Sequence, residues 1–327
     1  MYRCLLFLAA VLPAGAQSVL YVCGNSTENY VVGSKLPPSG VFKRSPDGKW
    51  THIGYPLPFI FSFTGDPARK DGLLLAAGNG LLRTAGAGLD WTQLTGSDVT
   101  ELRDVDTDPN APGTICFGHT AGIRITHDNA KTWREIGGPL RRKFTEAIRF
   151  DPKRPRVLLA GNEQGIFRTE DEGGSWRLAG ASGLQVLRIA GSPHDPCFWV
   201  AATQAGGLFA SSDCGVTFEN LGAVGFGRNV YDVSFDPSVP GRIAVAGWGP
   251  GIVVSGDNGK TWTPRNAGLP RTDATGVAFD PSHPGRLFAA IHDDAVYVSD
   301  DAGVTWRKDG LANSHVNRMR FVPEVVK

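Results

Sequence analysis

The sequence lacks three features that would have assigned it to a common functional class. After the first dozen residues, no stretch approaches the roughly 20 apolar residues that a membrane-spanning helix requires, so we expect no membrane insertion. The 33 basic and 32 acidic residues are spread along the chain without a basic run, which argues against nucleic-acid binding. No cluster of histidine and cysteine residues has metal-ligand spacing, so we expect no metal and no other cofactor.

Motifs of several enzyme classes are missing as well. The chain has no glycine-rich phosphate loop and no nucleophile elbow. His119 and His292 are lone histidines without metal-ligand spacing between them, which argues against a shared metal site. No nucleotide-dependent or metal-dependent activity is therefore indicated.

The first sixteen residues have the layout of a secretory signal peptide. Arg3 precedes an apolar run, Leu5 to Leu12, that is too short to span a bilayer. Ala14 and Ala16 then place small residues at the −3 and −1 positions of a cleavage site before Gln17. We predict a signal peptide over residues 1–16, a single domain over residues 17–327, and a secreted or periplasmic location.

One motif repeats along the whole chain. An aromatic residue recurs every 41 to 44 residues, at Trp50, Trp91, Trp133, Trp176, Phe218, Trp262 and Trp306. Six of the eight tryptophans occupy this position, so the period does not arise from composition alone. Each aromatic ends a variant of the motif S/T-x-D-x-G-x-T/S-W, as in SGDNGKTW at Ser255–Trp262. The first two copies depart most from the motif.

Each position of this motif suits a tight turn between two strands. The aspartate can accept hydrogen bonds from backbone N–H groups within the turn. The glycine takes the positive φ that closes the turn, and the aromatic residue begins the next strand and packs against its neighbours. We therefore predict a structural and not a catalytic role for Asp128, Asp171, Asp213, Asp257 and Asp301.

The rest of the repeat predicts an all-β fold. Short apolar segments alternate with Asp-Pro and glycine-rich turns about every ten residues, and no segment shows a convincing helical period. The repeat count predicts a seven-bladed β-propeller with four antiparallel strands per blade. The N-terminal strand, Val19–Cys23, and the C-terminal strand, Val316–Phe321, should share one blade and close the ring, which removes exposed sheet edges.

These repeats resemble the Asp-box, or bacterial neuraminidase repeat, superfamily of β-propellers over essentially all of residues 17–327. The layout is closest to single seven-bladed propellers of the photosystem II stability and assembly factor type and of the sortilin type. The superfamily also includes sialidases and xyloglucan-degrading hydrolases. The resemblance implies the fold, and it leaves the function open because these members have unrelated activities.

The strand order separates two ends of the propeller. The Asp-Pro turns and the Asp-box turns share one end, whereas the hairpins between second and third strands share the other end, which we call the top face. Loops on a rigid scaffold are where binding residues usually lie. The ligand-binding candidates on this face are Arg103, Arg188, Tyr231, Asp232, Trp248, His292 and Arg318.

Each candidate also has a simpler interpretation. Arg188 and Asp232 can pair with each other as channel charges, and this is the more common fate of such residues. Trp248, flanked by glycine in a hairpin, can stack on a sugar or can pack between blades, and the sequence favours neither.

Two cysteines are candidates for a disulfide. An oxidising compartment permits one, and Cys197 and Cys214 fall at the same end of the fifth blade. Cys23 and Cys116 belong to different blades and should be free and buried. The alternative is that all four are reduced and act as small apolar residues.

Two classes of function stay open. The favoured one is an exported, monomeric, non-catalytic module that holds a protein or carbohydrate partner on its top face. The alternative is a sialidase-like or xyloglucanase-like glycoside hydrolase. Against a sialidase, Arg124, Arg188 and Arg242 lack the Arg-Ile-Pro context, and sialidase propellers have six blades instead of seven. Against a xyloglucan hydrolase, those enzymes pair two propellers around opposed aspartates, whereas this sequence predicts one propeller. An arginine-lined mouth favours binding, whereas two carboxyl groups roughly 5–9.5 Å apart favour hydrolysis.

Overall fold

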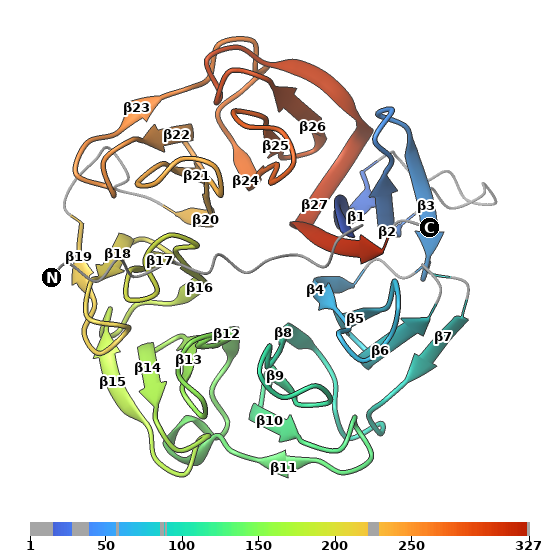
Figure 1. The fold of residues 1–327 in the computed structure, drawn as a ribbon, viewed down its shortest axis with the longest axis vertical. Coiled ribbons are helices and arrows are strands. Elements are labelled where there is room, and N and C mark those ends of the chain that lie inside the picture. Colours follow the sequence, from blue (N-terminus) through green and yellow to red (C-terminus); the bar gives the residue numbers. More distant parts are fainter. Residues whose placement is uncertain are drawn as a thin grey trace, which may run out of the picture.

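The computed structural model describes residues 16–27, 39–56, 59–85, 88, 90–221 and 229–325. Over these residues the chain forms seven antiparallel β-sheet blades around a central channel (Figure 1). The predicted all-β, seven-bladed propeller is therefore confirmed. The part of the chain that is described contains no helix long and apolar enough to cross a membrane. The predicted signal peptide lies almost wholly outside the described residues.

Five blades are four-stranded sheets of consecutive strands. The first of these blades contains β4 (Ile60–Gly65), β5 (Leu73–Ala77), β6 (Gly80–Ala85) and β7 (Asp90–Gln93). The second contains β8 (Leu102–Thr107), β9 (Ile115–His119), β10 (Gly122–Thr126) and β11 (Arg134–Glu135). After the short 3-10 helix η1 (Gly138–Leu140), the next contains β12 (Thr145–Phe150), β13 (Leu158–Asn162), β14 (Gly165–Thr169) and β15 (Arg177–Gly180). The fourth blade contains β16 (Val186–Gly191), β17 (Trp199–Thr203), β18 (Gly207–Ser211) and β19 (Glu219–Asn220). The fifth contains β20 (Val230–Phe235), β21 (Ile243–Gly247), β22 (Gly251–Ser255) and β23 (Thr263–Pro264).

The remaining two blades form one seven-stranded sheet that closes the ring. It contains β24 (Ala274–Phe279), β25 (Leu287–Ile291), β26 (Asp294–Ser299), β27 (Arg307–Val325), β1 (Ala16–Ser26), β2 (Gly40–Arg44) and β3 (Trp50–Gly54). The first part of β27 pairs with β26, and the later part pairs with β1, where Val22 lies opposite Met319. The predicted sharing of one blade by the two chain ends is confirmed.

Strand β27 differs from the sequence prediction in one respect. The sequence predicted an outer strand after Trp306 and a separate inner strand at Val316–Phe321, whereas the structure has one continuous strand that passes from one blade to the next (Figure 1). Positive φ values at Leu311 and Asn313 mark the place where the chain changes blades. Hydrogen bonds to β26 before this place and to β1 after it keep the two parts of the segment extended.

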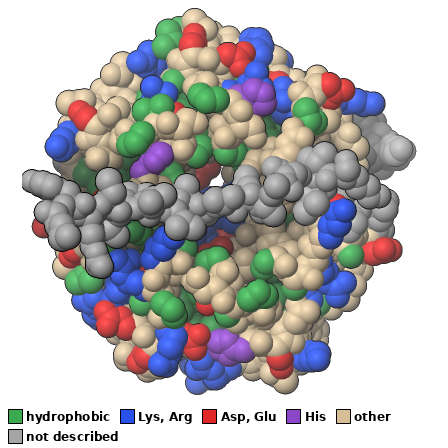
Figure 2. All heavy atoms as spheres, in the orientation of Figure 1, with side chains coloured by type: hydrophobic (Ala, Val, Ile, Leu, Met, Phe, Trp, Pro, Cys, Tyr) green, Lys and Arg blue, Asp and Glu red, His purple; other side chains and the backbone are tan. Residues whose placement is uncertain are grey.

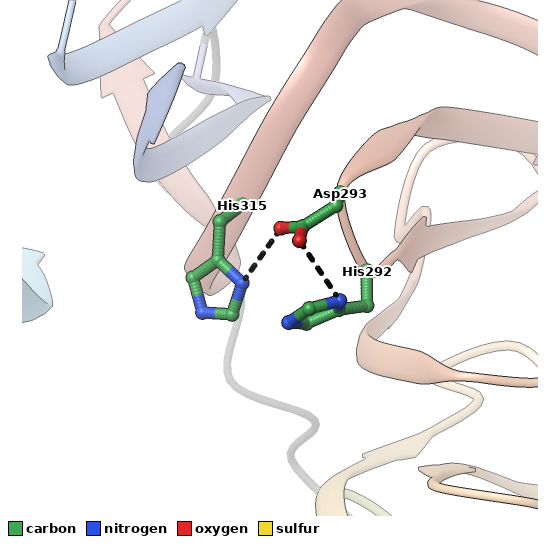
Figure 3. Close-up of side chains that lie close together, drawn as sticks. All are labelled: His292, Asp293 and His315. Carbon is green, nitrogen blue, oxygen red and sulfur yellow. Dashed lines mark ion pairs between the residues drawn. The ribbon is translucent and has the colours of Figure 1, made fainter. Parts of the chain in front are cut away.

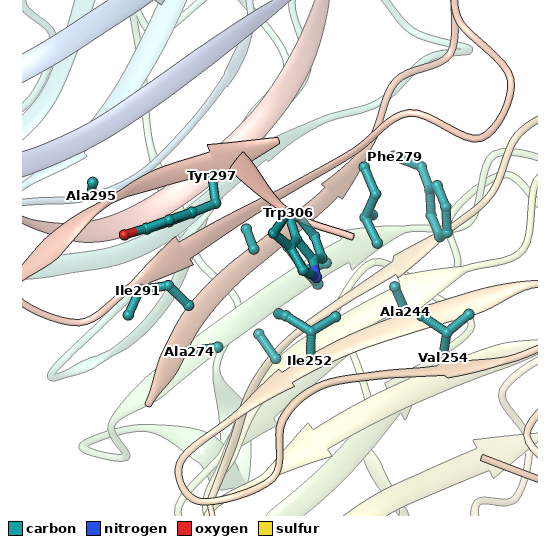
Figure 4. Close-up of a cluster of buried hydrophobic side chains, with 13 residues drawn as sticks. Ala244, Ile252, Val254, Ala274, Phe279, Ile291, Ala295, Tyr297 and Trp306 are labelled. Atoms are coloured by element: carbon teal, nitrogen blue, oxygen red, sulfur yellow. The ribbon is translucent and has the colours of Figure 1, made fainter. Parts of the chain in front are cut away.

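The hydrophobic core lies between the blades. Second strands such as β5, β21 and β25 are buried along their whole length because both faces of each sheet are covered by neighbouring blades. This explains why these strands read as continuous apolar runs instead of alternating patterns. Figure 4 shows one such interface, in which Trp306 of one blade packs toward Ile252 of the preceding blade.

The Asp-box turns make the same set of hydrogen bonds in five blades. The Asp257 carboxylate accepts hydrogen bonds from the Ser255 hydroxyl (2.8 Å) and from the backbone N–H and hydroxyl of Thr261 (2.8 and 2.6 Å). These hydrogen bonds, those from Thr261 first, lower the pKa of Asp257 to about 2. Equivalent bonds form at Asp128, Asp171, Asp213 and Asp301.

The aromatic residue of the repeat ties neighbouring blades together. The indole N–H of Trp306 donates to the backbone carbonyl of Arg265 (2.8 Å), and that of Trp176 donates to Ile136 (2.7 Å). At these two positions tryptophan buries its ring while its polar N–H is satisfied. Elsewhere on the surface, charged side chains of both signs are distributed around the rim (Figure 2).

Candidate functional site

Every inner strand is irregular at the same place, near its start. The pairing of β8 with β9 skips one residue between Leu102 and Asp104, so Arg103 is left out of the ladder as a β-bulge. The same shift occurs once in each of the seven blades. The residues left out, which we call the bulge ring, are Phe61, Arg103, Glu146, Leu187, Tyr231, Thr275 and Asn317.

All seven residues of the bulge ring line one pocket of about 280 Å³. A bulge re-aims a side chain, and here it directs one side chain per blade toward the mouth of the channel. Hairpins of the same end add further walls, and the pocket is completed by Arg188, Gln204, Trp248, His292, His315 and Val316. The volume is near the lower end of the roughly 300–1,000 Å³ that small-molecule sites occupy.

Arg103 and Glu146 form the charged part of this pocket. The Arg103 guanidinium lies between the rings of Phe61 and Phe144, 4.2 and 4.5 Å from their centroids. Its Nε is 3.8 Å from Oε1 of Glu146. Burial raises the pKa of Glu146, and Arg103 and Arg188 offset this only in part. Glu146 therefore takes up a proton at a higher pH than an exposed glutamate does.

An aromatic wall faces this charged pair across the pocket. The ring of Trp248 lies 6.4 Å from that of Tyr231 and 4.8 Å from that of His292. The His292 ring in turn lies 4.8 Å from that of His315. Trp248 also keeps 37% of its surface exposed. The ring contacts support the interpretation of packing between blades, and stacking on a sugar stays a prediction.

Several buried polar atoms of the pocket have no hydrogen-bond partner among the described residues. They are Nε of Arg103, Nε of Arg188 and Oγ1 of Thr275. All three atoms are shielded from solvent, and the two arginine nitrogens lie 3.8 Å from the carboxylates of Glu146 and Asp232. The pocket offers a ligand other polar groups, such as the exposed side chain of Gln204, beside the partly exposed Trp248.

Two of the sequence candidates lie deeper in the channel. Asp232 and Arg318 are buried and form an ion pair of 3.2 Å, and Nε of Arg188 lies 3.8 Å from the same carboxylate. They line a second cavity of about 370 Å³ together with Arg149 and Arg320. Arg318 is thus occupied within the protein and not presented at the mouth, whereas Arg103, Arg188, Tyr231, Trp248 and His292 do meet in one pocket.

Asp104, on the inner strand β8, is also enclosed. Its carboxylate accepts hydrogen bonds from the Ser62 hydroxyl (2.6 Å) and the Ile148 N–H (3.2 Å), and it forms an ion pair with Arg149. Burial raises the pKa of Asp104, but Arg149 and Arg318 outweigh this and hold it well below its usual range. Both aspartates therefore belong to the ion-pair network of the channel.

Phe61, Leu187, Thr275 and Asn317 were not among the candidates from the sequence. Apolar and neutral residues carry no chemical signature, but all four occupy the same repeat position as Arg103, Glu146 and Tyr231. Aligning the seven inner strands and selecting the column with the greatest variety would have found them.

Outside the pocket, Cys197 and Cys214 form a disulfide, and Cys23 and Cys116 are buried with free thiols. Burial raises the pKa of Cys23 to about 12.

Comparisons with known proteins show a likeness of fold to solved GH74 structures. No family model matches the sequence, and no curated protein matches it. Among solved structures, a GH74 enzyme from Niastella koreensis superposes with a TM-score of 0.73 at 17% identity, covering 90% of this chain and 55% of that one. An ancestral GH74 enzyme gives 0.65 at 14% identity, covering 76% and 38%, and the GH74 xyloglucanase from Xanthomonas campestris gives 0.62 at 17%, covering 76% and 45%.

At this identity the likeness shows the fold, and the chain spans about half or less of each neighbour's length. The neighbours are GH74 enzymes, and at this identity their activity is no evidence for the activity of this chain. They do not identify the chain specifically with the Asp-box superfamily, which remains a resemblance of the repeats. The activity has to be argued from the pocket itself.

Proposed function

We propose that this protein binds a carbohydrate in the pocket formed by the bulge ring. The observation that carries the proposal is the juxtaposition, in the lining of one pocket, of the partly exposed Trp248 with the polar side chains of Arg103 and Gln204. A sugar ring has an apolar face that stacks on aromatic side chains and hydroxyl groups that accept and donate hydrogen bonds around its edge. The pocket matches both properties at once.

Two further observations support a carbohydrate over a protein partner. The pocket is concave and of small-molecule size, whereas a stable protein interface buries roughly 800 Å² on each partner. The structural neighbours are carbohydrate-active enzymes built on the same fold. The predicted signal peptide adds an expectation of export, which would bring the site into contact with glycans outside the cytoplasm.

Glycan-array screening followed by isothermal titration with the best ligand tests this proposal. Trp248→Ala should weaken binding by about 30-fold, the loss expected for a hot spot of about 2 kcal/mol, with little change in melting temperature. The matched control is Leu178→Ala, which shortens an exposed apolar residue on the outer strand β15 and should leave affinity unchanged. Failure to bind any glycan, or full binding by the Trp248 variant, would contradict the proposal.

Glycoside hydrolysis is the second candidate function, and one observation favours it. The pKa of the largely buried Glu146 is raised, as a general acid requires, and its side chain lines the same pocket. Among the described lining residues Glu146 is the one carboxylate, whereas hydrolysis by the usual mechanisms uses two. Binding is for this reason placed first.

The two functions are separated by Glu146→Gln. If the protein is a hydrolase, release of reducing ends from xyloglucan or from chromogenic glycosides should fall by about 10²–10⁴-fold in this variant, while glycan affinity is retained. If the protein only binds, the wild type releases no product, and Glu146→Gln changes affinity alone.

A further inference from the structure

His292, Asp293 and His315 form a cluster that the sequence did not reveal. His292 and Asp293 make up the hairpin between β25 and β26, and His315 lies on β27, which reaches the same place from the next blade. One nitrogen of each imidazole and one oxygen of the carboxylate all lie within 4.8 Å of one another. Figure 3 shows the Asp293 carboxylate between the two imidazole rings.

The distances within this cluster are longer than hydrogen bonds. Nδ1 of His292 is 3.4 Å from Oδ2 of Asp293, and Nδ1 of His315 is 3.7 Å from Oδ1. An N–H···O hydrogen bond usually measures about 2.7–3.2 Å. Two ligand atoms that are each about 2.1 Å from one ion at the tetrahedral angle lie about 3.4 Å apart. The two distances, each to a different oxygen of the carboxylate, are close to this separation, and the imidazole nitrogens lie within 4.8 Å of each other.

The local backbone fixes this arrangement. Asp293 has a φ of 51°, a left-handed conformation that aspartate tolerates better than most residues. This turn directs the carboxylate toward His315 instead of away from the blade. The backbone N–H of His292 donates to the carbonyl of Asp273 (2.8 Å), and its ring packs against Trp248 at 4.8 Å. The backbone and ring of His292 are thus held by neighbouring residues before any ion binds.

We propose that His292, Asp293 and His315 bind one divalent transition-metal ion, for which Zn²⁺ is the natural probe. Two imidazoles and one carboxylate are a donor set that suits zinc and its neighbours and disfavours Ca²⁺ and Mg²⁺, which select oxygen ligands. Three protein ligands leave at least one coordination position for water or a ligand oxygen. Both imidazoles line the bulge-ring pocket, so the ion would lie in its wall.

Isothermal titration of the chain with Zn²⁺ tests this site. The protein is prepared without a polyhistidine tag and treated with a chelator beforehand. The wild type should bind one ion per chain, and His292→Ala, His315→Ala and Asp293→Asn should each weaken binding by at least about tenfold. The control is His283→Ala, because His283 makes a 3.0 Å pair with Asp280 at the opposite end and is not part of the cluster. Its affinity for Zn²⁺ should match that of the wild type.

A second measurement reports the ligands directly. Co²⁺ added to the wild type should give visible absorption bands of a nitrogen-coordinated site, and the bands should disappear in the double variant of His292→Ala and His315→Ala. Melting temperatures confirm that each variant is folded. The proposal is overturned if the wild type binds no stoichiometric ion, or if the double variant binds as the wild type does. No glycan is present in either measurement, so the result is independent of the carbohydrate proposal.

Discussion

At one end of the channel, the Asp-box turns repeat the same hydrogen bonds from blade to blade, whereas at the other end the bulge ring places a different side chain in every blade. Asp257 and Asp301 make the same bonds, each to a serine before it and a threonine after it. Phe61, Arg103 and Glu146 share one structural position and differ in size and charge. A position that is constant in a repeat maintains the blade, and a position that varies can distinguish ligands.

The largest expected effect on stability comes from opening the ring of blades, because the structures at both ends of the channel depend on the closed ring. Deletion of residues 314–327 removes the part of β27 that pairs with β1 and leaves that sheet without its inner strand. Because each blade is held by its neighbours, we expect loss of the cooperative thermal transition for the whole domain. Circular dichroism on heating measures this. A truncated chain that melts like the full-length protein would refute closure by the chain ends.

The next largest effect is expected in the channel between the two ends. Asp104→Ala leaves the buried Arg149 without its partner and should destabilise the protein by about 3–5 kcal/mol in denaturant unfolding. Asp90→Ala, on the exposed strand β7, is the control and should have little effect. A loss no larger than that of the control would mean that the ion-pair network is not needed for stability.

The same residue predicts a dependence of stability on pH. The pKa of Asp104 is lower in the folded protein than in the unfolded chain, whose value is near 3.8. The ionised carboxylate therefore contributes stability above that pH, and the contribution is lost as the pH falls toward the folded-state pKa. The free energy of unfolding should thus fall less steeply in Asp104→Asn than in the wild type between pH 5 and roughly 3. Parallel curves would contradict this assignment.

A smaller effect is expected from a hydroxyl at the Asp-box end. Ser299 is fully buried, and its hydroxyl accepts hydrogen bonds from the N–H groups of Gly303 (2.7 Å) and Asp301 (3.2 Å). Ser299→Ala leaves these donors unpaired and should lower the free energy of unfolding by roughly 1–3 kcal/mol. Ligand affinity should not change. A loss of affinity without a loss of stability would reverse the roles of the two ends.

The smallest effect is expected from the matching hydroxyl at the bulge ring. Thr275 has a buried hydroxyl oxygen without a partner among the described residues, so Thr275→Val removes no hydrogen bond from the folded protein. Stability should stay level or rise slightly, while glycan affinity should fall by about 2- to 10-fold if the side chain turns its hydroxyl toward a bound ligand. Calorimetry measures both quantities on the same sample. Reduced stability with unchanged affinity would remove Thr275 from the site.

The fold was predictable because the same turn chemistry recurs with the period of the blades. The repeated aspartate, glycine and tryptophan positions identify one turn in seven copies, and seven copies determine the blade count. The junction within β27 was not predictable in the same way. Whether Leu311 and Asn313 end a strand or bend it depends on hydrogen bonds to two different blades, which lie far apart in the sequence.

The site was predictable in part. Strand direction alone brings Arg103, Arg188, Tyr231, Trp248 and His292 to one end, and the structure gathers them in one pocket. Arg318 is the residue after Asn317, which forms the bulge. Neighbouring residues of a strand point to opposite sides, so the side chain of Arg318 lies in the channel near Asp232. Sequence spacing likewise could not pair His292 with His315, because they come from different blades.

The most direct test of this account is hydrogen exchange in the free and ligand-bound protein, with the tightest-binding glycan from the array. The account predicts slower exchange where the inner strands begin, around the bulge ring, and in the hairpins that carry Trp248 and His292. Exchange at the Asp-box turns around Asp257 and Asp301 should be the same in both states. Protection of the Asp-box turns with no change at the bulge ring would contradict the assignment of ligand binding to the variable end of the channel.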